Sequence, residues 1–138
     1  MNWHDAADVD PAAWRKAMRA ELLAKREALP AEERRGEDER ITELLLLGFP
    51  SLRQGALGFY WPMKGEFDPR VATHRLRQQG ARTALPVVVA KGAPLEYREW
   101  HTGVETRPGV FGLPVPVDTA VVAPDGVLAP PLGFDGRG

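Results

Sequence analysis

The sequence contains no cysteine. A disulfide framework, a thiolate nucleophile and a cysteine-based zinc site are therefore excluded, and we expect the chain to work in the reducing cytoplasm. Histidine is scarce as well, and the histidines that occur do not stand at the spacing of metal ligands, so we predict no metal-ligating residues. The histidines are His4, His74 and His101.

The sequence also lacks an excess of one charge, because 18 basic residues stand against 19 acidic ones. A net charge of -1 provides no field that would attract nucleic acid or an anionic membrane, and we expect neither as a partner. The longest apolar run, residues 44–49, is far too short to span a bilayer, and the acidic start of the chain lacks the basic residues of a signal peptide. We therefore expect a cytoplasmic protein, and we expect it to be a monomer.

What the sequence does contain is the pattern of one α/β domain over residues 1–138, of which 43% are hydrophobic. Prolines and glycines lie between segments whose hydrophobic periodicity indicates helices or strands. A strand, a helix and a second strand follow one another, which predicts a parallel βαβ unit. The expected helices cover 11–29, 30–48 and 69–79, and the expected strands cover 56–61, 83–89, 95–100 and 127–129.

A basic stripe runs along the first expected helix. Arg15, Arg19 and Arg26 fall within roughly 40° of one another, beside an apolar seam that begins at Trp14. Arginines in this position can hold a phosphate chain bidentately. The pattern alone favours the plainer alternative of a solvated helix face, since exposed rows of charge are common.

A loop with Lys64, Gly65 and Glu66 follows the first expected strand, which ends at Trp61 and Pro62. Open α/β sheets bind ligands just beyond the carboxyl ends of their strands, so this loop is a candidate binding loop. An ordinary connection with solvated charges explains it equally well. Further along, Phe111 stands between glycines in a long connection over 101–118, where it can stack on a flat ligand or plug the core, and the plug is favoured.

Taken in order, five segments resemble the 5-formyltetrahydrofolate cyclo-ligase family, also called methenyltetrahydrofolate synthetases. The resemblance implies a three-layer α/β sandwich with a mostly parallel sheet and the N-terminal helices packed on it. It also implies an enzyme that uses ATP and Mg2+ to convert 5-formyltetrahydrofolate to 5,10-methenyltetrahydrofolate. The segments are Arg15-Lys16-Ala17-Met18-Arg19, Phe59-Tyr60-Trp61-Pro62 with Glu66, Leu85-Pro86-Val87-Val88, residues 95–116 with Phe111-Gly112-Leu113-Pro114, and Pro130 to Asp135.

Site residues are implied by the same resemblance. The basic residues that touch the ATP phosphates in the family match Arg15 and Arg19, with Lys16 between them. The folate contacts match Trp61 and Glu66, and Phe111 aligns with a tryptophan that packs beside the pterin in some members. In the implied reaction the formyl oxygen attacks the γ-phosphate of ATP, and N10 then attacks the phosphorylated formyl group and expels phosphate. The resemblance assigns no catalytic residue.

The carboxyl end departs from the family pattern. In the family the Leu-Gly-Phe-Asp segment, here residues 132–135, leads to a glycine-rich run of the form Arg-Leu-Gly-Tyr-Gly-x-Gly-Tyr-Tyr-Asp, which wraps the nucleotide, and this run is not among the 138 residues. We therefore expect a domain that is incomplete on its C-terminal side, and that is inactive as it stands. Two alternatives stay open: a non-catalytic remnant that binds folate or nucleotide, and an unrelated α/β sugar-phosphate enzyme or scaffold with the same architecture.

Overall fold

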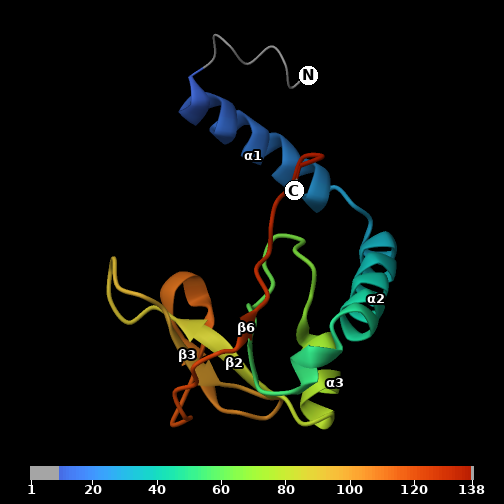
Figure 1. Ribbon diagram of the computed structural model, residues 1–138. Coiled ribbons are helices and arrows are strands. Elements are labelled where there is room, and N and C mark those ends of the chain that lie inside the picture. The colour runs from blue at the N-terminus through green and yellow to red at the C-terminus, as the bar shows by residue number, and fades with distance from the viewer. Residues whose placement is uncertain (1–9, 138) are drawn as a thin grey trace.

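The protein is described by a computed structural model that covers residues 10–137; His4 lies outside these residues. Figure 1 shows helices α2 and α3 to one side of the strands and helix α1 set apart from them. The helices are α1 (Pro11–Glu27), α2 (Ala31–Gly48) and α3 (Arg70–Gln78), and a 3-10 turn, η2 (Pro50–Arg53), follows α2. The strands are β1 (Ala56–Gly58), β2 (Arg82–Val87), β3 (Glu96–Glu99), β4 (Thr106–Pro108), β5 (Pro114–Pro116) and β6 (Gly126–Val127).

The main sheet has the order β3-β2-β1-β6. Strand β1 is parallel to both β2 and β6, and only β3 is antiparallel to its neighbour. The predicted β1–α3–β2 unit and the predicted mostly parallel α/β fold are confirmed. The predicted edge strand over 95–100 is confirmed as well, as β3.

Local chemistry explains where the helices begin. The Asp10 side chain accepts the backbone N–H of Ala12 at 3.1 Å, and Pro11 occupies the first turn, where its missing N–H costs nothing. Helix α2 follows Pro30 and carries two glutamates in its first turn, which suits the positive end of the helix dipole. For α3, Pro69 is the N-cap residue, and the carboxylate of Asp68, one position earlier, accepts the backbone N–H of Arg70 at 3.0 Å.

The core lies between α3 and the strands β1 and β2. Leu57, Leu76 and Ala81 form its centre with exposed fractions of 4% or less, and Leu46 of α2 and Leu52 pack against them. Helix α1 differs, because none of its residues is buried. The predicted apolar seam of α1 is half-buried, and Figure 1 shows the C-terminal segment, drawn in red, running up to α1.

The long connection over 101–118 contains a second, two-stranded sheet that the sequence did not predict. Strands β4 and β5 pair antiparallel, with Pro108 opposite Pro114, and β5 lies against β2 and β3. Proline is tolerated at the edge of a sheet because no partner requires its missing N–H. The same prolines indicate a loop when only the sequence is read, which explains the difference.

Candidate functional site

The loop after β1 is a tight turn over residues 63–66. Lys64 and Gly65 both have positive φ, 49° and 75°, and the backbone N–H of Glu66 donates to the Met63 carbonyl at 3.0 Å. Two consecutive positive φ angles are the mark of a type I′ turn. The Glu66 carboxylate closes the turn a second time, because its Oε1 accepts the Met63 N–H at 2.8 Å. Glu66 therefore has a structural role that the sequence did not indicate.

This turn is bound to the C-terminal end of α1. Arg26 donates from Nε to the Lys64 carbonyl at 3.0 Å. Arg34 of α2 donates from Nη2 to the carbonyl oxygens of Arg26 at 3.2 Å, Glu27 at 3.4 Å and Leu29 at 3.2 Å, and so satisfies acceptors that the helix end leaves free. Gly65 faces this corner, since a Cβ on it would lie 3.2 Å from Arg34 Nη2 and 3.3 Å from the Arg26 carbonyl oxygen.

A groove of about 480 Å³ lies between α1 and the C-terminal segment. The segment approaches α1 closely, because a Cβ on Gly133 would lie 2.9 Å from Leu22 Cδ1. Arg15 and Arg19 line this groove, whereas Lys16 is exposed on the helix and does not line it. The other lining residues are Trp14, Met18, Leu22, Pro131, Leu132, Gly133, Phe134 and Asp135.

Glu66 lines a separate cavity of about 330 Å³ where α1, α2 and the loop after β1 meet. Arg26, Arg34 and Tyr60 line it too, together with Pro130 and Pro131. Burial raises the pKa of Tyr60 to about 12, with the carboxylates of Glu66, Asp38 and Asp68 adding to the rise. Tyr60 is therefore a neutral phenol at physiological pH, and it donates its hydroxyl to the Phe67 carbonyl at 2.8 Å.

Trp61 belongs to an aromatic cluster on another side of the same loop. Its ring meets Trp100 edge to face at a centroid distance of 5.6 Å, and Trp100 meets Phe59 at 5.7 Å. The Arg70 guanidinium lies 4.8 Å from the centroid of the Trp61 ring, a cation–π contact. Asp68 holds Arg70 in place at 2.7 Å, and this hydrogen bond lowers the pKa of Asp68. Trp61 is half-buried and so keeps part of its ring accessible.

Phe111 does not plug the core, which corrects the alternative that the sequence favoured. Its side chain is 88% exposed, and it stands in the 3-10 turn η3 (Val110–Gly112) between β4 and β5 with a φ of 56°. The connection between the two strands is closed by a hydrogen bond from the Gly109 N–H to the Leu113 carbonyl at 2.7 Å. A role in stacking on a flat ligand stays a prediction.

The structure thus gathers some predicted site residues and separates others. Arg15 and Arg19 share the α1 groove with residues 131–135, which lie more than a hundred positions away in the sequence. Glu66 and Trp61 lie on the same loop, but Glu66 lines the second cavity whereas Trp61 packs with Trp100. Arg26, Arg34 and Tyr60 are additional residues at these sites. Arg26 had a sequence signal as a member of the basic stripe and Tyr60 as part of a segment that resembles the family, whereas Arg34 had none.

Two features are absent from the described residues. Over residues 10–137 no group of three or more histidine, cysteine, aspartate and glutamate side chains is arranged to hold a metal ion. In the same range, no helix combines the length and the apolar character that crossing a bilayer demands.

Solved structures similar to this chain include two that are described as 5,10-methenyltetrahydrofolate synthetases. The structure from Aquifex aeolicus is 27% identical with a TM-score of 0.72, and the match covers 87% of this chain and 62% of that one. The structure from Mycoplasma pneumoniae is 20% identical with a TM-score of 0.65, covering 86% of this chain and 65% of that one, and it shows the shared fold. The chain therefore spans less than two thirds of either structure. No protein-family model matches the sequence, and no curated protein matches it.

Proposed function

The predicted resemblance to the 5-formyltetrahydrofolate cyclo-ligase family is confirmed by these structures, and from this premise we propose that the protein takes part in ATP-dependent conversion of 5-formyltetrahydrofolate to 5,10-methenyltetrahydrofolate. The observation that carries the proposal is the groove beside α1. It brings Arg15 and Arg19, which the resemblance connects with the ATP phosphates, together with the Leu-Gly-Phe-Asp segment at 132–135, which in the family precedes the run that wraps the nucleotide. The proposed ligands are therefore ATP and a reduced folate.

The groove suits a polyanion. The two arginines provide planar donor pairs that fit phosphate oxygens, and Lys16 adds a third cation on the same helix. Mg2+ is held in such sites by phosphate oxygens and one or two carboxylates, and Asp135 is the carboxylate that lines this groove. The residues present thus fit magnesium that arrives with ATP, and they do not need to form a metal site by themselves.

For the folate we propose Trp61, Glu66 and Phe111. A pterin is flat and offers N–H donors along one edge, which suits an aromatic ring and a carboxylate. Glu66 Oε1 is occupied by the Met63 N–H, so the pterin donors would be accepted by the second carboxylate oxygen. The exposed Phe111 ring is free to cover a ligand from the β4–β5 turn.

The proposed chemistry is phosphoryl transfer followed by ring closure. A bond forms between the formyl oxygen and the γ-phosphorus while the bond from that phosphorus to the bridging oxygen of ADP breaks. N10 then forms a bond to the formyl carbon and gives up its proton to solvent, and the carbon–oxygen bond breaks to release phosphate. The protein's part is to hold the oxygen, the phosphorus and N10 in line and to offset charge with arginine.

We test the proposal by calorimetric titration of the chain with 5-formyltetrahydrofolate, with and without ATP, in the wild type and in Glu66→Gln. The glutamine can still accept the Met63 N–H, but it replaces a charged acceptor by a neutral one, so folate binding should weaken by roughly 1 to 2 kcal/mol. ATP binding should stay unchanged. Glu105→Gln, an exposed carboxylate between Val104 and Thr106, is the matched control and should bind folate as the wild type does. No folate binding by the wild type would contradict the proposal.

A second candidate function is a non-catalytic module that binds folate or nucleotide. It is the alternative that the sequence left open, and it needs the binding residues of the groove but no turnover. The near-ultraviolet chromophore of methenyltetrahydrofolate distinguishes the two candidates, since only the enzyme forms it from the formyl substrate. For both candidates we propose a monomer in the cytoplasm that binds neither nucleic acid nor membrane.

A further inference from the structure

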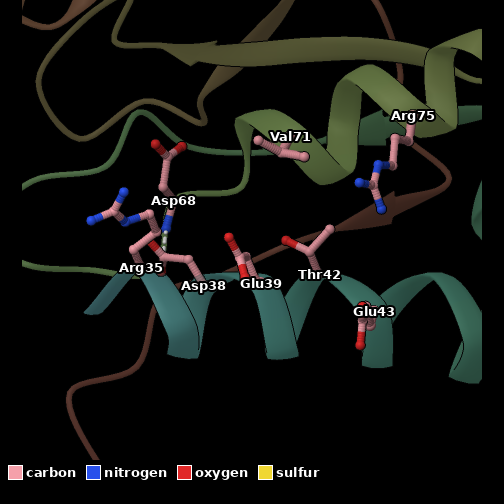
Figure 2. Close-up of a pocket in the computed structure, with 8 residues that line it drawn as sticks. All are labelled: Arg35, Asp38, Glu39, Thr42, Glu43, Asp68, Val71 and Arg75. Atoms are coloured by element: carbon pink, nitrogen blue, oxygen red, sulfur yellow. Dashed lines mark hydrogen bonds between the residues drawn. The ribbon is translucent and has the colours of Figure 1, made fainter. Parts of the chain in front are cut away.

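A third hollow, distinct from the proposed ATP and folate sites, lies between α2 and α3. It has a volume of about 510 Å³, within the range of small-molecule sites. Figure 2 shows α2 as its floor, α3 on the opposite side, and the loop before α3 at one end. Its lining residues are Arg35, Asp38, Glu39, Thr42, Glu43, Asp68, Val71 and Arg75.

Thr42 is the unusual member of this lining. Three threonines are buried among the described residues, and two of them have partners: Thr73 donates to the Arg70 carbonyl at 3.0 Å, and Thr83 to the Trp100 carbonyl at 2.6 Å. Thr42 is 4% exposed, and its hydroxyl has no hydrogen-bond partner within residues 10–137. Figure 2 shows this side chain standing in the space between the two helices. Among the described residues its oxygen is not one of the polar atoms that lack both a partner and access to solvent, so the hydroxyl opens into the hollow, where a bound molecule can reach it.

Charges of both signs in the hollow also lack partners. Glu39 and Glu43 of α2 and Arg75 of α3 form no ion pair among the described residues. Asp68 is different, because Arg70 holds it at 2.7 Å. Figure 2 places Arg75 at one end of the hollow and Glu39 nearer its middle, beside Thr42. Arg35 also forms no ion pair among the described residues, so the charges are spread along the hollow, with Arg35 at the end near Asp68, Glu39 nearer the middle and Glu43 on the side of Arg75.

We propose that this hollow binds a small zwitterion that carries a primary ammonium group and a carboxylate a few bonds apart. The ammonium has three donors, and the Glu39 carboxylate and the Thr42 hydroxyl oxygen accept two of them. The Arg75 guanidinium binds the carboxylate as a planar pair of donors. The hydrocarbon between the two groups covers Val71, whose side chain is 53% exposed. This site is independent of the folate and ATP proposals.

The first test compares three probes with the same carbon chain by calorimetric titration of the full chain. The probe 4-aminobutyrate carries both charged groups, n-butylamine lacks the carboxylate, and butyrate lacks the amine. We expect 4-aminobutyrate to bind with a Kd of about millimolar size, because the walls of the hollow are open to solvent. Each single-group probe should bind about tenfold more weakly. Equal binding of all three probes, tighter binding of either single-group probe, or no binding of 4-aminobutyrate would overturn the proposal.

The second test uses Thr42→Val, which keeps the shape of the side chain and removes its hydroxyl. Because that hydroxyl has no partner in the free protein, the variant should melt at the same temperature or higher, while binding of 4-aminobutyrate falls several-fold. Glu39→Gln should weaken the binding of 4-aminobutyrate in the same way and leave the binding of butyrate unchanged. Glu33→Gln, exposed in the first turn of α2, is the matched control and should behave as the wild type. Unchanged binding in Thr42→Val, or a large fall in its melting temperature, would contradict the assignment.

Discussion

The β1–α3–β2 unit and helix α1 are held in opposite ways. The unit buries Leu57, Leu76 and Leu85 with exposed fractions of 2% or less, so its position is fixed by apolar packing. Helix α1 buries no residue, and polar contacts made by Arg26 and Arg34 bind its C-terminal end to the turn at 63–66 and to α2. The two regions therefore depend on different forces.

This difference separates stability from the proposed chemistry. Arg15 and Arg19, the residues proposed for ATP, lie on the helix that contributes least to the core. The Glu66 turn lies between the two regions, because it follows β1 and contacts α1. Substitutions on α1 should alter binding without unfolding the protein, whereas substitutions in the β1–α3–β2 unit should do the reverse.

The largest expected effect is in the core. Leu76→Ala removes a side chain that is 2% exposed and packs on Leu57 and Ala81, so it should lower the free energy of unfolding by about 2 to 5 kcal/mol. Urea denaturation measures this loss. The matched substitution Leu22→Ala in α1 removes a half-buried side chain and should cost less than half as much. Equal losses would mean that α1 is as firmly packed as the core.

The next effect concerns ATP. Arg19→Ala should weaken ATP binding by about 1 to 3 kcal/mol, the size of a lost charged hydrogen bond, with folate affinity unchanged. Its melting temperature should stay that of the wild type, because Arg19 is exposed on a helix without buried residues. Arg40→Ala removes an equally exposed arginine from α2 and serves as the control. A steep fall in melting temperature with unchanged ATP binding would favour the solvated helix face.

A glycine exchange tests the connection between the regions. Gly65 has a φ of 75°, and a Cβ there would press on Arg34 and on the Arg26 carbonyl, so Gly65→Ala should lower the free energy of unfolding by about 1 kcal/mol or more. Gly36→Ala in α2 meets no atom within 4 Å and should raise that free energy by about 0.5 to 1 kcal/mol. Chemical denaturation of the pair should therefore give changes of opposite sign. Two changes of the same sign would contradict the geometry of the turn.

The smallest expected effect is a dependence of stability on pH. Hydrogen bonds from Arg82 at 2.8 Å and Arg77 at 3.1 Å lower the pKa of Glu99. A carboxylate with a lowered pKa in the fold stabilises it above the unfolded pKa, and this contribution is lost as the pH falls through the folded pKa. Glu99→Gln should therefore flatten the acid limb of the stability profile by less than about 1 kcal/mol, because the arginines are partly exposed. The pair of Glu21 and Lys25 on α1 is exposed, so Glu21→Gln should not measurably change the acid limb of the stability profile.

The sequence predicted the helices and the strand order that follow from hydrophobic periodicity and from prolines and glycines at the ends of elements. All three helices lie within their expected ranges, because proline before α2 and Gly80 after α3 mark the boundaries in ways that depend only on local residues. The parallel β1–α3–β2 unit followed from its order of elements. The shared groove of Arg15, Arg19 and residues 132–135 was not predicted, since no local pattern connects these residues.

What could not be predicted depends on contacts between distant residues. In the sequence Arg34 is one of many charged residues of α2. In the structure it donates to three carbonyl oxygens at the end of α1. Glu66 reads as a ligand-binding carboxylate, and its bond to the Met63 N–H appears only once the positive φ angles of Lys64 and Gly65 are known. The β4–β5 sheet was missed because its prolines, which suit an edge position, also indicate a loop.

The attachment of α1 near one end makes the helix a lever. Arg26 and Arg15 are eleven residues apart, so they lie about 16 Å from each other along the helix axis. A tilt of about 10° around the Arg26 end would displace Arg15 by about 3 Å, the length of a hydrogen bond. Arginines that must meet phosphate oxygens tolerate far less than this. The approach of Gly133 to Leu22, about one helical turn from the pivot on the side of the arginines, is a second point of contact that limits this tilt.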